Sequence, residues 1–180
     1  MNLYVVRHGQ TDLNLEHRLQ GRKGLPLNET GLQQAQELHE KLKDVKFDLA
    51  FSSPQERAIQ TVSIASGIDR DKIILDERLQ PCDMGEADNL VIDENLHFEF
   101  GLLPVRTEYK GVENPEDFRA RIKSFLDEII KKYARQDINI ILGGHKCTTG
   151  CIEGIINGFP ENGDFFAIST KNGQFKLYKF

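Results

Sequence analysis

The chain has 180 residues, 39% of them hydrophobic, which suffices for one well-buried core and is short for two domains. Its formal net charge is -5 and its acidic and basic residues are interspersed, which argues against a nucleic-acid surface or an anchor to an anionic membrane. Three cysteines without the spacing of a disulfide framework favour a reduced, cytoplasmic protein, and no stretch resembles a membrane span or a cleaved leader.

The first predicted elements are a strand and a helix. An apolar run rich in β-branched and aromatic residues over 2–6 predicts a buried strand. Thr30 and Gln33 form a capping-box pattern, and apolar residues then recur at helical spacing. We therefore expect a helix that runs to about Lys43.

A second strand and helix follow. Residues 49–51 predict a short strand. Ser53 as N-cap, Pro54 at the first helical position and Glu56 two residues later predict a helix start. Arg57 is then expected in or next to the first turn of this helix.

The second half of the chain continues the alternation. Residues 72–75 predict a third strand, Asn114 is expected to cap a long amphipathic helix, and residues 139–142 predict a fourth strand that ends at Gly143-Gly144-His145. The turn signal Asn172-Gly173 separates two apolar runs, 165–169 and 174–180, and predicts a C-terminal antiparallel hairpin.

This order of elements predicts an α/β fold: a single-domain three-layer sandwich over residues 1–180, with a mostly parallel central sheet, helices on both faces and the C-terminal antiparallel hairpin. Residues 80–112 lack a sustained period. A long irregular stretch in a compact domain is typically functional, so we expect this segment to be a lid over the site.

Cationic and imidazole side chains follow the predicted strands. Arg7 and His8 come after the first strand, Arg57 after the second, and His145 after the fourth. The carboxyl ends of parallel strands meet at one edge of a sheet, where ligands collect. Two guanidinium groups and two imidazoles at that edge would form a pocket for a phosphate dianion.

The sequence around these residues resembles the histidine phosphatase superfamily, in its phosphoglycerate-mutase-like branch. The resemblance rests on four stretches in the family's order, which span residues 3 to about 150: Arg7-His8-Gly9-Gln10-Thr11 with Asn14 and Gln20-Gly21, Pro26-Leu27-Asn28-Glu29-Thr30-Gly31, Ser52-Ser53-Pro54 with Arg57-Ala58, and Gly144-His145.

The resemblance implies that His8 accepts the phosphoryl group as a phosphohistidine, which water then hydrolyses. Covalent catalysis of this kind divides one difficult transfer into two easier steps. The family's pattern implies that three residues stabilise the negative charge on the transferring phosphoryl group: Arg7, Arg57 and His145. It implies that three others contact the phosphate or the substrate: Asn14, Gln20 and Gly21. One ring nitrogen of His8 should then donate to a fixed acceptor such as a backbone carbonyl, which leaves the other free.

The resemblance implies neither a cofactor nor a metal. A zinc site of His145, Cys147 and Cys151 can be imagined from their spacing, but no fourth ligand is evident. Buried, inert thiols are the better interpretation of the cysteines.

The chain departs from the family where the family places its proton donor, a glutamate. Pro81 stands at that position, and proline cannot transfer a proton. Asp83 is the first substitute in the same segment, followed by Glu86 and Asp88 and then by His97. Each of these could also be an ordinary solvated loop residue.

Two further positions differ. Lys146 follows the second histidine where relatives carry small residues, and it would either bind a further negative charge of the substrate or project to solvent. Gly24 stands where many relatives carry an acidic residue.

The leading hypothesis is therefore a metal-independent phosphomonoester hydrolase that acts on a small phosphorylated metabolite. A phosphoglycerate-mutase-type phosphotransferase is the nearest alternative. A noncatalytic phosphate-ester-binding protein, which has lost its proton donor at Pro81, is the alternative from another class. A homodimer could form if the C-terminal hairpin exposes a sheet edge.

Overall fold

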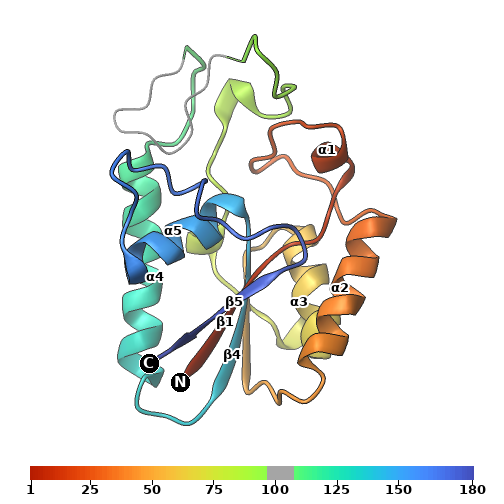
Figure 1. Ribbon diagram of the computed structural model, residues 1–180, viewed down its shortest axis with the longest axis vertical. Helices are drawn as coiled ribbons and strands as arrows, with labels where there is room; N and C mark the ends of the chain where they lie inside the picture. The colour runs from red at the N-terminus through yellow and green to blue at the C-terminus, as the bar shows by residue number, and fades with distance from the viewer. Residues whose placement is uncertain (97–107) are drawn as a thin grey trace.

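The computed structural model describes residues 1–96 and 108–180 (Figure 1). The strands are β1 (Asn2–Arg7), β2 (Leu49–Ser52), β3 (Ile74–Leu75), β4 (Asn139–Gly144) and β5 (Phe175–Lys179). The α-helices are α1 (Asp12–Leu15), α2 (Glu29–Leu42), α3 (Glu56–Ser66), α4 (Pro115–Tyr133) and α5 (Lys146–Asn157). Short 3-10 turns cover Arg70–Lys72, Glu77–Leu79 and Gly85–Ala87.

The strands form one sheet in the order β3-β2-β4-β1-β5. β1, β2, β3 and β4 are parallel, and β5 runs antiparallel to β1. The register pairs Arg7 with Gly144, so β1 and β4 end at the same level. The residues that follow these two strands, His8 and His145, therefore leave the sheet side by side.

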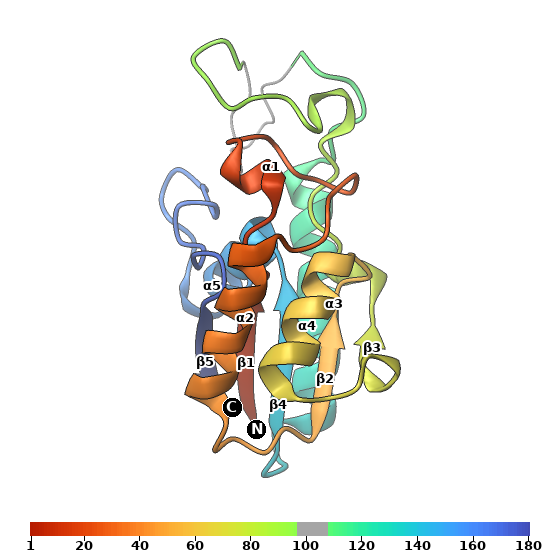
Figure 2. The same cartoon turned by 90° about the vertical axis from the view of Figure 1, so that its right-hand side faces the viewer.

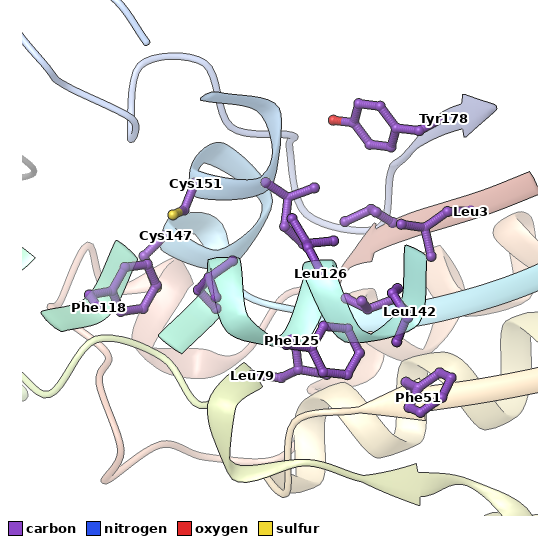
Figure 3. Packing of buried hydrophobic residues seen from close by; sticks show 14 of the residues in the cluster. Leu3, Phe51, Leu79, Phe118, Phe125, Leu126, Leu142, Cys147, Cys151 and Tyr178 are labelled. Carbon is purple, nitrogen blue, oxygen red and sulfur yellow. The ribbon is translucent and has the colours of Figure 1, made fainter. Parts of the chain in front are cut away.

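Helices cover both faces of the sheet, α2 and α3 on one side and α4 and α5 on the other (Figure 2). Along β1, Leu3 and Val5 pack in a cluster with residues of α4 and α5, whereas Tyr4 and Val6 pack in a second cluster with residues of α2 and α3. Successive side chains of a strand point to opposite faces, which explains this alternation. Figure 3 shows the first cluster, which includes Phe125 of α4. The predicted fold class is confirmed.

Two predicted helix caps differ from the observed ones. Asn28, not Thr30, caps α2, because its side-chain oxygen accepts the Gly31 N–H at 2.9 Å. α3 begins after Gln55, and the Ser53 hydroxyl instead accepts the Gln55 N–H at 3.2 Å in the preceding turn. Arg57 is nevertheless the second residue of α3, as the sequence predicted.

The predicted C-terminal hairpin is wrong in one of its strands. β5 is present and antiparallel, but its partner is β1, not residues 165–169. Phe165 is instead buried in the core, where its ring stacks on that of Phe118 with centroids 5.5 Å apart. Residues 165–168 form turns that place this ring in the core, while the turn at 172–173 still directs the chain into β5.

The described parts of the 80–112 segment, 80–96 and 108–112, contain one 3-10 turn and two isolated bridges, Arg18 with Val91 and Met84 with Val112. In Figure 1 they lie beyond the carboxyl edge of the sheet, on the same side as α1. That this segment acts as a lid stays a prediction. No helix in the described part of the chain is both long enough and apolar enough to span a membrane.

Candidate active site

A cavity of about 540 Å³ lies at the carboxyl edge of the sheet. Its wall combines cationic or imidazole side chains, amide side chains, and apolar or sulfur-containing side chains. The first group is Arg7, His8, His17, Arg18, His145 and Lys146, the second is Asn14, Gln20 and Asn172, and the third is Leu19, Met84, Ile92, Cys147 and Phe166. No aspartate or glutamate occurs among the described residues of the wall, so the cavity is suited to an anion.

His8 is buried and fixed in one orientation. It follows β1, its exposed fraction is 4%, and its Nδ1 lies 2.6 Å from the carbonyl oxygen of Gly9. A carbonyl accepts only, so Nδ1 carries the proton and Nε2 presents a lone pair. Burial, and then the charges of Arg57 and Arg7, hold the pKa of His8 well below its usual value, so the imidazole is neutral.

His145 stands beside His8, with the two ring centroids 5.2 Å apart. Its Nε2 lies 2.8 Å from the hydroxyl of Ser53, while its buried Nδ1 has no hydrogen-bond partner in the described structure. Burial, followed by the charge of Arg57, also lowers the pKa of His145 well below its usual value. A buried polar atom without a partner is costly, and a bound oxyanion would supply the partner for Nδ1.

Arg7, which is partly buried, and Arg57, which is buried, bring two guanidinium groups near the two imidazoles. Arg7 donates from Nη1 to the carbonyl oxygen of Thr170 at 2.9 Å, and Arg57 donates from Nη2 to that of Gly21, also at 2.9 Å. In both side chains the buried Nε lacks a partner among the described residues. Burial lowers the pKa of each to about 10, which leaves both cationic at neutral pH. Among the described residues neither cation forms an ion pair with a carboxylate, as expected where an anionic ligand supplies the counter-charge.

Arg57 itself is not part of the cavity wall, although its charge influences both imidazoles. Its exposed fraction is only 1%, and a second guanidinium nitrogen, Nη1, donates to the side-chain oxygen of Gln55 at 3.1 Å. The guanidinium thus ties the loop around Gly21 to the start of α3.

Gly24 makes room for that guanidinium. A Cβ atom at this position would lie 1.8 Å from Nη1 of Arg57, a distance that the two atoms cannot adopt. We expect Gly24→Ala to displace the Arg57 guanidinium and to lower kcat/KM for a phosphate ester on the order of a hundredfold, the typical cost of a misplacement of about 1 Å. The thermal midpoint should change little, because the displaced atoms end a side chain.

Lys23→Ala, in the same loop, is the matched control for this measurement and should keep wild-type activity. Equal activity of Gly24→Ala and Lys23→Ala would contradict the role given to the glycine.

The substrate-contact residues expected from the sequence are placed as follows. Asn14, Gln20 and Lys146 line the cavity, whereas Gly21 lies behind it and accepts the hydrogen bond from Arg57. Lys146 is the first residue of α5, and its Nζ lies 5.9 Å from the centroid of the Phe166 ring. Burial and the charge of Arg7 lower the pKa of Lys146.

The structure does not bring the carboxylate candidates for proton donor into the cavity wall. Asp83 accepts the Gly85 N–H at 3.0 Å, and its other oxygen lies 3.5 Å from Arg22. Asp88 accepts backbone N–H groups of residues 21 and 23, and Glu86 accepts that of residue 110. Pro81 is buried, and His97 lies outside the described residues. The site therefore assembles the four basic residues without these acids.

The three cysteines are free and buried. Cys147 lines the cavity, and the Cys82 N–H points to its sulfur at 3.3 Å. Burial raises the pKa of all three thiols, that of Cys151 to about 12, so they are protonated. In the described residues, no group of three or more histidine, cysteine, aspartate or glutamate side chains is arranged to hold a metal ion.

Three polar wall residues were not expected from the sequence: His17, Arg18 and Asn172. His17 has a positive φ of 52°, uncommon for a residue with a side chain. Arg18 was recognisable as a basic residue just before Gln20-Gly21. Asn172 had been interpreted only as a turn residue, and nothing near it in the sequence signals a place in the cavity.

The two buried histidines predict a pH-dependent stability. In the folded protein the pKa of each lies well below 6.5, so below pH 6.5 the unfolded chain binds more protons than the folded protein. The contribution of these two histidines to the free energy of unfolding is complete above pH 6.5 and is lost as the pH falls below that value. We expect the free energy of unfolding to drop by up to about 1.4 kcal/mol per pH unit for each histidine.

Urea unfolding between pH 7.5 and 5.5, in phosphate-free buffer, measures this slope. The double variant His8→Gln/His145→Gln should flatten it, and an unchanged slope in that variant would refute the assignment.

The chain was compared with known proteins. A family model described as histidine phosphatase superfamily (branch 1) matches residues 3–175. The "Uncharacterized phosphatase PhoE" of Bacillus subtilis (strain 168) is 30% identical over 141 residues, 78% of this chain and 70% of that protein. The "Probable phosphoglycerate mutase GpmB" of Enterobacter sp. (strain 638) is 29% identical over 168 residues, 89% and 76% of the two chains.

Solved structures share the fold. A mycobacterial glucosyl-3-phosphoglycerate phosphatase, solved with VO3, superposes with a TM-score of 0.79 at 22% identity over 98% of this chain and 91% of that chain. Bacillus stearothermophilus YhfR gives a TM-score of 0.82 at 22% identity over 98% and 89%. These matches show the shared fold, while the family model and the sequence relatives support a function of the phosphatase or mutase type.

Proposed function

Since the chain belongs to the histidine phosphatase superfamily, branch 1, we propose that it hydrolyses the phosphomonoester of a small metabolite through a phosphohistidine at His8. One observation carries the proposal. A buried imidazole, neutral and held at Nδ1 by the Gly9 carbonyl, stands among Arg7, Arg57 and His145. A nucleophile beside preorganised donors is the arrangement that phosphoryl transfer requires.

The proposed reaction has two steps. The lone pair on Nε2 of His8 attacks phosphorus, the bond from phosphorus to the ester oxygen breaks, and that oxygen takes up a proton. Water then attacks the phosphohistidine, the phosphorus–nitrogen bond breaks, and orthophosphate leaves neutral His8. Arg7, Arg57 and the unpartnered Nδ1 of His145 stabilise the charge on the transferring group in both steps.

The wall of the cavity supports a small, anionic substrate. Its volume of about 540 Å³ lies in the range of small-molecule sites. We propose that Asn14 and Gln20 contact the phosphoryl group and that Lys146 binds a further negative charge of the substrate. Gly21, which the sequence also suggested as a contact, acts through its hydrogen bond with Arg57 instead. In this proposal the protein needs no metal or cofactor and acts in the cytoplasm, which its three free cysteines support. A homodimer remains a prediction.

Hydrolysis of p-nitrophenyl phosphate by the purified protein in excess EDTA tests the proposal. We expect turnover with release of orthophosphate. Tight binding of the ester without turnover would instead identify a noncatalytic binding protein, the alternative that Pro81 favours. Transfer of the phosphoryl group to an added alcohol or sugar phosphate rather than to water would identify a phosphotransferase.

Asp83 is proposed as the proton donor, although it does not line the cavity in this structure. Asp83→Asn should then slow alkyl phosphates at least about tenfold and p-nitrophenyl phosphate much less, because nitrophenolate leaves without an acid. Glu94→Gln, an exposed carboxylate of the same segment that is not a candidate donor, is the matched control. Equal slowing of both substrates by Asp83→Asn, or no slowing at all, would reject Asp83.

A further inference from the structure

Asn172 contacts the loop that follows β1 from the opposite end of the sequence. It lies in the turn before β5, the strand that pairs with β1 (Figure 1). Its side-chain Nδ2 is 3.0 Å from the carbonyl oxygen of His8, 3.2 Å from that of Gly9 and 3.1 Å from Oδ1 of Asn14. The two N–H groups of this amide therefore face three acceptors, so that one N–H is shared between two of them. The acceptors belong to the candidate nucleophile His8, to Gly9 and to Asn14.

The contact with Gly9 concerns the protonation of His8. The Gly9 carbonyl is the group that holds the Nδ1 proton of His8, at 2.6 Å. If this peptide rotated, the imidazole would lose the acceptor that places its proton on Nδ1 and its lone pair on Nε2. The Asn172 amino group, which lies within hydrogen-bond distance of the carbonyls of both His8 and Gly9, resists that rotation. The neighbouring Gly173 N–H, 3.2 Å from the carbonyls of Arg7 and His8, strengthens the same connection.

The contact with Asn14 concerns the orientation of an amide. Oδ1 of Asn14 accepts from Asn172 and also from the Thr11 N–H at 3.2 Å. Both partners are donors, so the oxygen must face them and the Asn14 amino group must face elsewhere. Because Asn14 lines the cavity, this amino group is available to donate to an anion bound there.

We propose that Asn172 is a positioning residue of the active site: it fixes the Nδ1–H tautomer of His8 and the donor orientation of the Asn14 amide. The expected effect of Asn172 on the reaction rate rests on the proposed function. Its expected effect on the tautomer of His8 rests on the geometry alone. Asn172 touches the cavity, but its effect on the reaction passes through His8 and Asn14.

Asn172→Asp is the sharpest variant. The carboxylate has nearly the shape of the amide but donates nothing, so it would face three acceptor oxygens that it repels. Asn172→Ala removes the donor without adding charge, and Lys171→Ala, one residue earlier and exposed, is the matched control.

The first measurement is independent of activity. Nitrogen-15 NMR of the free protein at pH 7.5 reports which ring nitrogen of His8 carries the proton. We expect the Nδ1–H tautomer to dominate in the wild type and in Lys171→Ala, and to give way to a mixture of tautomers in both Asn172 variants. Retention of the wild-type tautomer in both variants would overturn the proposal, whether or not the protein is a phosphatase.

The second measurement is kinetic. We expect the rate of His8 phosphorylation to fall ten- to a hundredfold in Asn172→Asp, on the order of the cost of a misplaced reacting group, with a smaller change in KM. In a double-mutant cycle with Asn14→Ala, the two effects should be less than additive, because one residue acts through the other. Full additivity, at unchanged thermal stability, would refute the link to Asn14. A wild-type protein without turnover would remove the proposed function but leave the NMR result to decide on the tautomer.

Discussion

Replacing His8 by asparagine is expected to lower the turnover of p-nitrophenyl phosphate by at least about a thousandfold. In the proposed mechanism no other group can carry the phosphoryl group, so the loss falls on kcat and not on KM. Asparagine keeps a polar side chain of similar reach in the buried position, which limits the structural effect of the change. A phosphate-release assay with the protein in large excess over contaminating phosphatases measures the residual rate.

A control variant and a trapping experiment make this test specific. His39, a partly buried histidine of α2 remote from the cavity wall, provides the matched control, and His39→Asn should retain wild-type turnover. Brief mixing of the wild type with substrate should trap phosphorus on the protein in an acid-labile, base-stable form, as expected for phosphohistidine. Turnover within tenfold of wild type in His8→Asn, or trapped phosphorus in that variant, would exclude His8 as the acceptor.

Replacing Arg57 is expected to have the second largest effect, a loss of about a hundred- to a thousandfold in kcat, which is typical for the removal of one preorganised donor. Arg57→Gln removes both the charge and the guanidinium, whereas Arg57→Lys keeps the charge but not the geometry that binds two oxygens at once. We expect both variants to be impaired, because Nη2 also ties the Gly21 loop to α3.

Comparison of Arg57→Gln with Arg57→Lys also separates the effect of the positive charge from the effect of the guanidinium geometry. The charge of Arg57 is the second cause, after burial, of the low pKa of both His8 and His145. Arg57→Gln should therefore raise the pKa of both imidazoles relative to wild type, while Arg57→Lys should change them less. Proton NMR titration of the two histidines measures this difference. Full activity in either variant, or identical histidine titrations in both, would contradict the role assigned to the guanidinium.

The fold could be predicted because its signals are local and strong. Apolar runs identified the buried strands, and Asn114, whose side chain accepts the Glu116 N–H at 2.8 Å, caps α4 as expected. The prediction of the α2 N-cap failed because two nearby residues could each cap the helix. Asn28 and Thr30 are both good N-caps, and the structure uses the asparagine, whose side chain accepts the Gly31 N–H.

The active site was predictable to the extent that it follows strand ends. Arg7, His8 and His145 lie where β1 and β4 end in register, so chain position alone brings them together. Asn172 could not be found in this way, because its acceptor on His8 is 164 residues away along the chain. Asp83 shows the converse, because a position counted along a motif does not give the direction of a side chain. Its carboxylate accepts the N–H of Gly85, where a 3-10 turn starts, and lies near Arg22.

The pairing of β1 has a consequence for how the protein acquires activity. Both neighbours of this first strand, β4 and β5, come from residues after 138, and the turn that supports the His8 loop comes from residues 172–173. Contacts between such distant parts of a chain form slowly, because a long loop must close before they stabilise anything. The loop that carries His8 therefore cannot reach its folded arrangement until β4 and β5 have docked against β1, and the cavity at the sheet edge is completed only in the last steps of folding.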